Sequence, residues 1–333
     1  MLKLAFRALA VVILVVLAYI AVGGGVSAVA AQGKMRGEKV DIGGRSLRIV
    51  CVGEASDAPL VVFESGAFGF SADWGVVQDK LAAKGLRSCS YDRAGLGFSD
   101  PGPKPRDAEA IAADLDALLR ARGEAGPYVL VGHSMAGLFV RQFAVTHPEK
   151  VAGVVLVDAA TPEAIYSPMV TVFLKRFSQA STLAGWGAST GLFKPLSPLI
   201  GDRIGLTGEA RAEKQRFFGS GPHNRWSAEE VRTWPHSAQQ VLKAGGYDPA
   251  WPVAVVTAGP EAGREDWKKV QAAPATTSLA GSVAHVAAAG HATLLGVRHA
   301  DAIVAAIEGV LAARPARAEP TPPPPEPAPA PAA

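Results

Sequence analysis

The sequence has few cysteines, little net charge and no cluster of basic residues. Cys51 and Cys89 are the only cysteines among 333 residues, and their separation does not match the paired spacing of a metal site. The 33 lysines and arginines nearly balance the 30 acidic residues, and they are scattered, leaving a net charge of +3. These absences argue against a metal site and a nucleic-acid partner, and we expect no cofactor.

Charge is also missing from a long run near the start of the chain. Lys3 and Arg7 precede residues 8–31, which carry no charged side chain. Residues 8–22 alone have the length of a signal-peptide core, and residues 28–30 resemble a cleavage site. The whole run could cross a bilayer if glycines 23–25 are tolerated.

We therefore assign residues 1–33 to a signal or anchor segment and slightly favour a retained anchor, with the basic end in the cytoplasm. The body is predicted to be exported. It would be membrane-anchored and face away from the cytoplasm, or be secreted or periplasmic if the segment is cleaved. Residues 314–333 consist mostly of proline and alanine, which predicts a disordered tail.

Between these ends, apolar runs alternate with helical patterns. Hydrophobic residues make up 49% of the chain, which is enough for a sizeable core. Such alternation predicts an α/β fold with a mostly parallel sheet covered on both faces. Strands are expected at 40–42, 47–52, 60–64, 87–91, before Ser134, and at 154–157, 253–257 and 283–286, with helices at 74–84, 107–122 and 300–311.

The alternation stops between residues 161 and 251, which are too many for a loop. We predict a helical cap there, inserted into a core formed by residues 34–160 and 252–313. Residues 209–218 and 227–233 have helical patterns. Most of the cap's aromatic residues are expected to form its own core, and a few to line a pocket; they are Phe173, Phe177, Trp186, Phe217, Phe218, Trp226 and Trp234.

Ser134 lies between a buried strand and a helix, in the order strand, sharp turn, helix. This is the setting of a nucleophile elbow, and small residues at Gly132, Ala136 and Gly137 suit its tight turn. Ser189 fits the G-x-S-x-G pattern more strictly, but no apolar strand precedes it. We expect Ser189 to lie in a loop and Ser134 to be the nucleophile.

Several local runs accompany the elbow, at residues 64–67, 71–74 and 91–100 and at Gly290-His291. Together these motifs resemble the α/β-hydrolase superfamily, in particular bacterial members with an N-terminal hydrophobic segment. The resemblance implies an eight-stranded sheet, a cap between the sixth and seventh strands, and catalytic residues in the order serine, acid, histidine. Two departures are Ala136, in place of a glycine, and Ser65, where many members have histidine.

The general base is expected to be His291, in a loop after the strand at 283–286. His133 adjoins the nucleophile but should point away from it, and His285 should be packed in its strand. The backbone N–H groups of Ala67 and Met135 would form the oxyanion hole. Asp92 and Arg93 are expected to brace a loop through hydrogen bonds and an ion pair. The other histidines lack supporting context; they are His147, His223, His236 and His299.

The triad acid has two candidates. In the superfamily it usually follows the seventh strand, but the expected position holds Ala262, and the nearest carboxylate, Glu261, is one residue early. Some relatives carry the acid after the sixth strand, where Asp158 ends an apolar run. We predict Asp158, with Glu261 as the alternative.

These residues predict a serine hydrolase that cleaves a small-molecule carboxylic ester, or less readily an amide, through an acyl-enzyme. Dehalogenases and epoxide hydrolases of this fold need a carboxylate nucleophile, which Ser134 is not. One alternative is an iminopeptidase-like peptidase, which would need an acidic anchor in the cap. Another is a non-catalytic envelope binding module. We expect the cap's glutamates to lie on solvated helix faces; they are Glu209, Glu213, Glu229 and Glu230.

Cys51 and Cys89 fall in strands that the resemblance would make neighbours. An exported protein meets oxidising conditions, so a disulfide is one possibility. We favour two buried free thiols.

Overall fold

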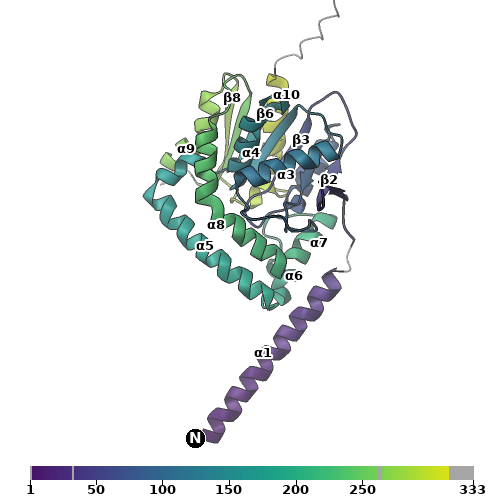
Figure 1. Ribbon diagram of the computed structural model, residues 1–333, viewed down its shortest axis with the longest axis vertical. Coiled ribbons are helices and arrows are strands. Elements are labelled where there is room, and N and C mark those ends of the chain that lie inside the picture. Colours follow the sequence, from purple (N-terminus) through teal and green to yellow (C-terminus); the bar gives the residue numbers. More distant parts are fainter. Residues whose placement is uncertain (1, 32–33, 261–264, 315–333) are drawn as a thin grey trace, which may run out of the picture.

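The computed structural model describes residues 2–31, 34–260 and 265–314. Its centre is one eight-stranded sheet in the order β1-β2-β4-β3-β5-β6-β7-β8 (Figure 1). β1 pairs antiparallel with β2 and β2 with β4, and the other neighbours are parallel. The predicted mostly parallel sheet is confirmed. The strands are β1 (Glu38–Asp41), β2 (Ser46–Val52), β3 (Leu60–Glu64), β4 (Ser88–Tyr91), β5 (Tyr128–His133), β6 (Val151–Val157), β7 (Val253–Ala258) and β8 (Gly281–Val286).

Helices cover both faces of the sheet, and each face has its own apolar core. Successive side chains of a strand point to opposite faces, so in β5 Val129 and Val131 enter one core and Leu130 the other. The first core includes residues of α2 and α10, and the second includes residues of α3, α4 and α9. These helices are α2 (Gly75–Ala82), α3 (Ala108–Ala121), α4 (Ala136–Thr146), α9 (Glu265–Thr277) and α10 (Ala300–Ala313).

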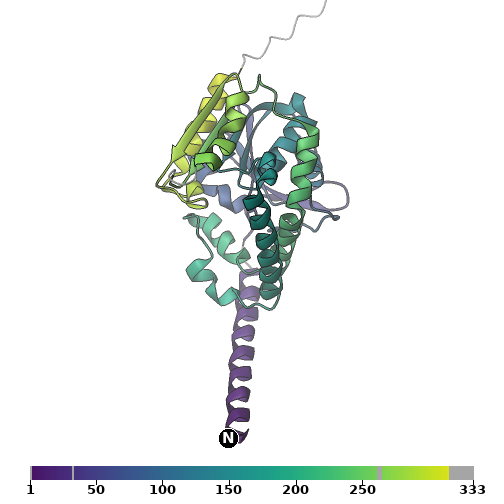
Figure 2. The ribbon, with the colours of Figure 1, turned by 90° about the vertical axis from the view of Figure 1, so that its left-hand side faces the viewer.

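A group of helices is inserted between β6 and β7. α5 and α8 are its long helices, and they lie side by side (Figures 1 and 2). α8 includes the predicted 227–233 segment but continues through Pro235. The inserted helices are α5 (Pro168–Ser189), α6 (Ser197–Ile200), α7 (Gly208–Phe217) and α8 (Gly221–Ala244). Short 3-10 helices occur at Ser71–Trp74, Pro148–Lys150, Pro162–Tyr166, Lys194–Leu196 and Thr293–Leu295.

Two expectations about this inserted region were wrong. Ser189 is not in a loop: it ends α5, and its hydroxyl donates a hydrogen bond to the Gly185 carbonyl oxygen one turn earlier. The aromatic residues do not mainly form a separate core. Phe177 packs against Phe68 of the sheet domain, and Phe173 and Trp186 are exposed. Phe177 also contacts Phe173 and Trp234 within the cap, so the rings make contacts inside the cap, with the sheet domain and with solvent.

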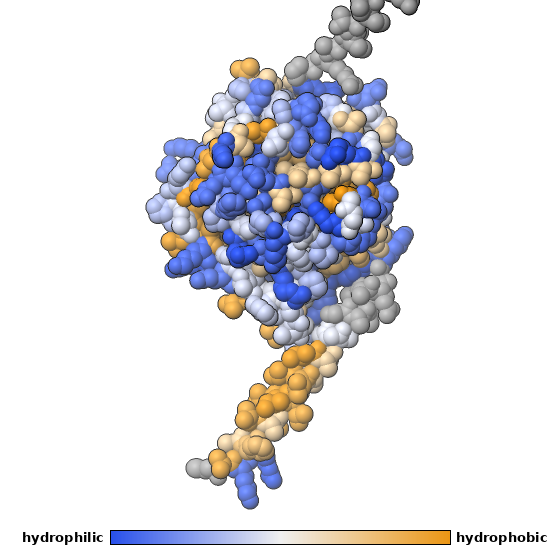
Figure 3. All heavy atoms as spheres, viewed as in Figure 1, coloured by the Kyte–Doolittle hydropathy of each residue, from blue (hydrophilic) through white to orange (hydrophobic). Residues whose placement is uncertain are grey.

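α1 (Leu2–Ala31) is one continuous helix that passes through glycines 23–25. It projects from the body beside the cap, and its surface is almost uniformly apolar up to the basic end (Figures 1 and 3). At about 1.5 Å per residue the helix is about 45 Å long, more than the hydrocarbon thickness of a bilayer. Residues Leu2–Val26 are long and apolar enough to cross a membrane.

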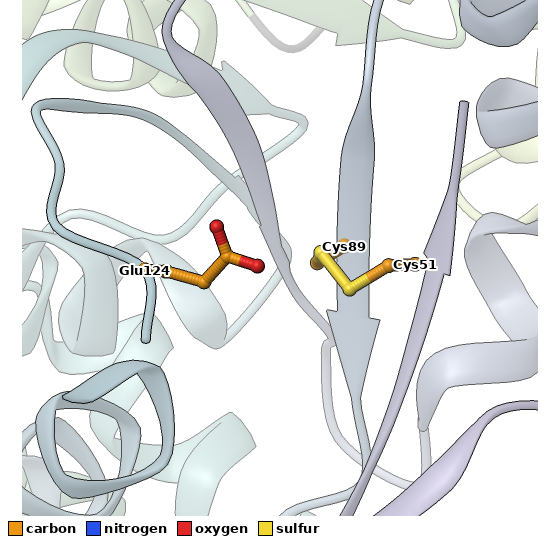
Figure 4. Close-up of side chains that lie close together, drawn as sticks. All are labelled: Cys51, Cys89 and Glu124. Atoms are coloured by element: carbon orange, nitrogen blue, oxygen red, sulfur yellow. A yellow bond between two sulfur atoms is a disulfide. The ribbon is translucent and has the colours of Figure 1, made fainter. Parts of the chain in front are cut away.

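Cys51 and Cys89 form a disulfide, so the expectation of free thiols was wrong. The two residues lie directly opposite each other in the antiparallel β2–β4 pair, with their Cα atoms 4.1 Å apart. Within the described residues, the one cluster with the composition of a metal site contains these sulfurs and Glu124 (Figure 4). The sulfurs are bonded to each other and Glu124 pairs with Arg87, so the cluster offers no thiolate ligand.

Candidate active site

Ser134 follows β5 directly and adopts φ 57°, the left-handed conformation of a strained turn. The turn allows little space. A Cβ at Gly137 would lie 2.3 Å from the Ala160 carbonyl oxygen, and one at Gly132 would lie 2.8 Å from the Val140 side chain. Ala136, which stands where the pattern has glycine, begins α4 and is completely buried.

His291 lies in the loop after β8, with its side chain 52% exposed. Its Nδ1 is 2.6 Å from Oδ2 of Asp158, which follows β6. The structure therefore brings together the predicted base and the preferred acid. Within the described part of the chain, no hydrogen bond joins Ser134 Oγ to His291; such catalytic contacts commonly tighten only on substrate binding. The alternative acid, Glu261, lies outside the described residues, as does the predicted tail from residue 315 onward.

Asp158 is held from several sides. Its Oδ1 accepts hydrogen bonds from Gln271 Nε2 at 3.0 Å and from the Ala258 amide at 3.2 Å, and Lys268 Nζ lies 3.6 Å away. Burial alone would raise the pKa of this carboxyl group, but the hydrogen bond and charge of His291, together with Gln271 and Ala258, hold the pKa well below its ordinary value. Asp158 is thus a carboxylate with Oδ2 directed at the imidazole.

The loop after β3 lies against the elbow. A Cβ at Gly66 would be 2.8 Å from Ser134 Cβ, so only glycine allows this approach. The neighbouring Ala67 therefore lies beside the serine, and both Gly66 and Ala67 line a cavity with it. Met135, the other predicted oxyanion residue, immediately precedes α4.

Arg93 clamps this loop, as expected for a bracing residue. Its guanidinium donates hydrogen bonds to the backbone carbonyl oxygens of Ser65 and Gly66 and forms ion pairs with Glu64 and Glu230. All of these charged groups are buried. Because Glu230 belongs to α8, one arginine connects the loop after β3 to the cap.

Ser65, the second departure from the family pattern, has a local partner. Its hydroxyl accepts a hydrogen bond from Trp74 Nε1 at 3.1 Å, and Trp74 is completely buried against Phe63. This contact satisfies the indole N–H and holds the start of the loop.

His133 has a position in the site that the sequence did not predict. Its Nε2 is 3.0 Å from the carbonyl oxygen of His291, and the two rings are 4.5 Å apart. Burial, followed by the nearby charge of His291, lowers the pKa of His133 to about 3. His133 is therefore neutral, and its Nε2–H donates to the backbone of the loop that carries His291. By contrast, His285 lies in β8 as expected and is half-buried, with Nδ1 2.8 Å from Thr257 Oγ1.

Ser134 and His291 line two cavities. One of about 320 Å³ includes Lys214 and His223 of the cap. The other, of about 670 Å³, is lined mainly by apolar residues of the cap, including Met169 and Phe173. A larger hollow of about 810 Å³ lies at the amino ends of the strands and contains none of the predicted catalytic residues. Residues of the cap thus line both cavities at the site.

Three of the cap glutamates are not solvated, contrary to expectation. Glu213 pairs with Arg48, Glu229 with Lys104, and Glu230 with Arg93, and all three carboxylates are buried. Only Glu209 is exposed. Helical periodicity did not reveal these partners because the pairing residues are distant in sequence. None of the four glutamates, all within the described ranges, lines a cavity at Ser134.

Comparisons with known proteins agree with this architecture. A family model described as alpha/beta hydrolase fold matches residues 59–190. An uncharacterized protein of Schizosaccharomyces pombe is 32% identical over 186 residues, 52% of this chain and 31% of that protein. The chain spans less than a third of the length of the first curated relatives that it matches.

Solved structures share the fold over most of the chain. The Cif epoxide hydrolase from Acinetobacter nosocomialis has a TM-score of 0.67 at 17% identity, covering 88% of this chain and 96% of that one. The enol-lactonase from Burkholderia xenovorans LB400 has a TM-score of 0.58 at 17% identity, covering 83% of this chain and 100% of that one. The family match, the strand order and the strand–turn–helix setting of Ser134 together show that the chain has the alpha/beta hydrolase fold.

Proposed function

We propose that the protein is a serine hydrolase that cleaves a carboxylic ester, or less readily an amide. The observation that carries the proposal is the 2.6 Å contact between His291 Nδ1 and Asp158 Oδ2 in a loop that shares a cavity with Ser134. A serine hydroxyl is a weak nucleophile until a base accepts its proton, and a carboxylate orients and stabilises that base.

In this mechanism Ser134 Oγ attacks the substrate carbonyl carbon while its proton passes to His291 Nε2. Asp158 accepts the hydrogen bond from Nδ1, which fixes the tautomer and stabilises the imidazolium. The protonated His291 then donates its proton to the departing alcohol, leaving an acyl group on Ser134. His291 then deprotonates a water molecule, which attacks the acyl carbon. The bond between the acyl carbon and Ser134 Oγ breaks, the acid leaves, and His291 returns the proton to Ser134 Oγ.

The negative charge that develops on the carbonyl oxygen is stabilised by the backbone N–H groups of Ala67 and Met135. Arg93 contributes indirectly, because it holds the carbonyl oxygens of the preceding residues, Ser65 and Gly66. Donors positioned before the reaction need no reorganisation in the transition state. Arg93 is thus a positioning residue.

An ester is favoured over the substrates of several structural neighbours. The epoxide hydrolases of this fold need a carboxylate nucleophile, whereas the elbow here holds Ser134. The iminopeptidase alternative is weakened because the cap glutamates Glu213, Glu229 and Glu230 are engaged in ion pairs. The apolar lining of the larger cavity suits an acyl or alcohol chain.

The second part of the proposal is that α1 anchors the enzyme in a membrane. Its Leu2–Val26 segment has the length and composition of a span. Lys3 and Arg7 at its start favour retention of that end in the cytoplasm, which places the hydrolase body on the other side. The Cys51–Cys89 disulfide is consistent with an oxidising compartment.

Covalent labelling separates an enzyme from a binding module. We expect a fluorophosphonate probe to label the full-length protein on Ser134, and a panel of p-nitrophenyl esters of increasing acyl length to be hydrolysed. Ser134→Ala should abolish labelling and lower turnover at least about 10⁴-fold. Ser189→Ala is the matched control and should behave as wild type. Labelling that persists in Ser134→Ala, or an unlabelled wild-type protein, contradicts the proposal.

A further inference from the structure

The outward side of α5 is unusually apolar for a helix on a protein surface. We define the outer face of α5 as Met169, Val172, Phe173, Leu183 and Trp186, whose side chains are all at least half exposed. These positions follow the helical period on one side. The opposite side is buried and includes Leu174, Ser181, Gly185 and Ala188.

A helix with apolar residues on both sides is normally covered on both. Here the sheet domain and α8 account for one side only. Exposed apolar residues continue past the end of α5, where Leu192, Leu196 and Leu199 are also exposed. An apolar surface of this extent indicates a binding partner or a lipid surface.

The charge of this segment distinguishes between a protein partner and a lipid surface. Residues 164–201 contain no aspartate or glutamate, and their cations are Lys175, Arg176 and Lys194. Lys194 is buried and donates to backbone carbonyl oxygens, but Lys175 and Arg176 are exposed. By helical periodicity Lys175 lies beside the outer face, and Arg176 lies on the face itself, between Phe173 and Leu183. Apolar residues flanked by cations without acids are typical of helices that bind anionic membrane surfaces.

The position of α5 relative to α1 also supports contact with a membrane surface. A Cβ at Gly23 of α1 would lie 2.4 Å from the carbonyl oxygen of Gly191, which follows the end of α5. The two glycines thus allow the backbones to meet near the end of the apolar span. Figure 1 shows α5 running crosswise to α1 at that end of the body. If α1 crosses a bilayer, α5 lies along its surface.

We propose that the outer face of α5 lies on the membrane into which α1 inserts, with its apolar side chains among the lipid headgroups and upper acyl chains. The inference depends on the proposed anchoring by α1. Met169 and Phe173 belong both to the outer face and to the lining of the 670 Å³ cavity that reaches Ser134. The cavity therefore opens at the lipid surface, and esters dissolved in the membrane are the substrate class that it admits.

Site-specific fluorescence tests the position of α5. Leu183→Cys in the full-length protein is labelled with nitrobenzoxadiazole under non-reducing conditions, because the native cysteines are bonded to each other. The protein is reconstituted in phosphatidylcholine–phosphatidylglycerol vesicles that contain doxyl-labelled lipid. Val16→Cys reports on α1, and Ala55→Cys, beside the hollow at the opposite edge of the sheet, is the exposed control.

We expect quenching at positions 16 and 183 but not at 55. Quenching at 16 alone overturns the position of α5 while leaving the anchor intact. Absence of quenching at both 16 and 183 overturns the anchoring and this inference with it. The emission of the label at position 183 could instead shift to the blue with increasing protein concentration and not be quenched by doxyl lipid. That result would show that a second copy of the chain covers the face, and it also overturns the proposal.

Kinetics provide an independent measurement. The double variant Leu183→Glu, Trp186→Glu should raise KM for a long-chain ester dissolved in vesicles about tenfold, because two apolar side chains no longer enter the membrane surface. Turnover of a water-soluble acetate ester should be unchanged. Ala55→Glu should alter neither. Equal losses on both esters in the double variant would indicate a folding defect and contradict the proposal.

Discussion

The two halves of the candidate site are constructed differently. On the sheet side, Ser134, Asp158 and His291 follow the carboxyl ends of β5, β6 and β8, so the register of the sheet fixes their spacing. On the cap side, the helices are held by side-chain pairs such as Arg93–Glu230, whose members are 137 residues apart. Strand pairing therefore positions the predicted catalytic residues, whereas side-chain pairs between residues distant in sequence position the cap.

The comparison predicts that the most severe effects come from the sheet side. Asp158→Asn should lower kcat about 10³-fold or more without unfolding the protein, because the amide can hold His291 in the wrong tautomer and cannot stabilise its cation. Glu261→Gln, in the matched alternative position, should leave kcat near that of the wild type. The rate of ester hydrolysis, measured at several pH values, decides between the two candidates. If Glu261→Gln lowers kcat strongly and Asp158→Asn does not, then Asp158 is not the triad acid.

On the cap side, Glu230→Ala should destabilise the protein by about 3 kcal/mol, because it removes one partner of a buried ion pair and leaves Arg93 with only Glu64. Glu209→Ala, an exposed glutamate on α7, should cost less than about 0.5 kcal/mol. Denaturant unfolding of both variants measures the difference. Equal stability of the two would mean that the buried pair does not hold the cap.

A change of pH is expected to have a smaller effect on stability, through a histidine at the same interface between the cap and the sheet domain. His223 on α8 accepts a hydrogen bond at Nδ1 from the Gly97 amide, and its Nε2 lies 3.3 Å from the Phe68 carbonyl oxygen. Burial, with a contribution from Lys214, lowers the pKa of His223 to about 3. Protonation of Nδ1 would break the bond from Gly97.

Since the folded-state pKa is below the unfolded value of about 6.5, the contribution of neutral His223 to stability is complete above pH 6.5 and is lost as pH falls toward 3. Melting temperatures between pH 7 and pH 4 should therefore decrease less in His223→Gln than in the wild type. His236→Gln, at a mostly exposed histidine of the same helix, should follow the wild-type curve. Parallel curves for all three proteins would exclude His223 as the source.

The same contrast explains what the sequence could predict. Strand–turn–helix patterns identified the Ser134 turn, and the end of an apolar run identified Asp158 as a candidate, because these features are local. Glu230 and His223 were not identified, since a charged or polar residue on a helix gives no sign of a partner more than a hundred residues away. Gln271, which donates to Asp158, likewise follows no motif.

The pair Cys51 and Cys89 is intermediate between features that the sequence predicts and features that it does not. The family resemblance placed the two strands side by side, yet it did not give the register, and only the register sets Cys51 opposite Cys89. A shift by one residue would direct one thiol to the other face of the sheet. The resemblance therefore predicts that the two strands are neighbours, but it does not predict that their cysteines are bonded.

The length and continuity of α1 affect how the activity must be measured. An enzyme tethered by this helix encounters a membrane-dissolved ester by lateral diffusion in two dimensions, so its rate depends on the mole fraction of ester in the lipid and not on the amount per volume of buffer. Dilution of vesicles at constant composition then leaves turnover per enzyme unchanged, whereas dilution of the ester with inert lipid lowers it. Kinetic constants for such substrates belong in units of surface density.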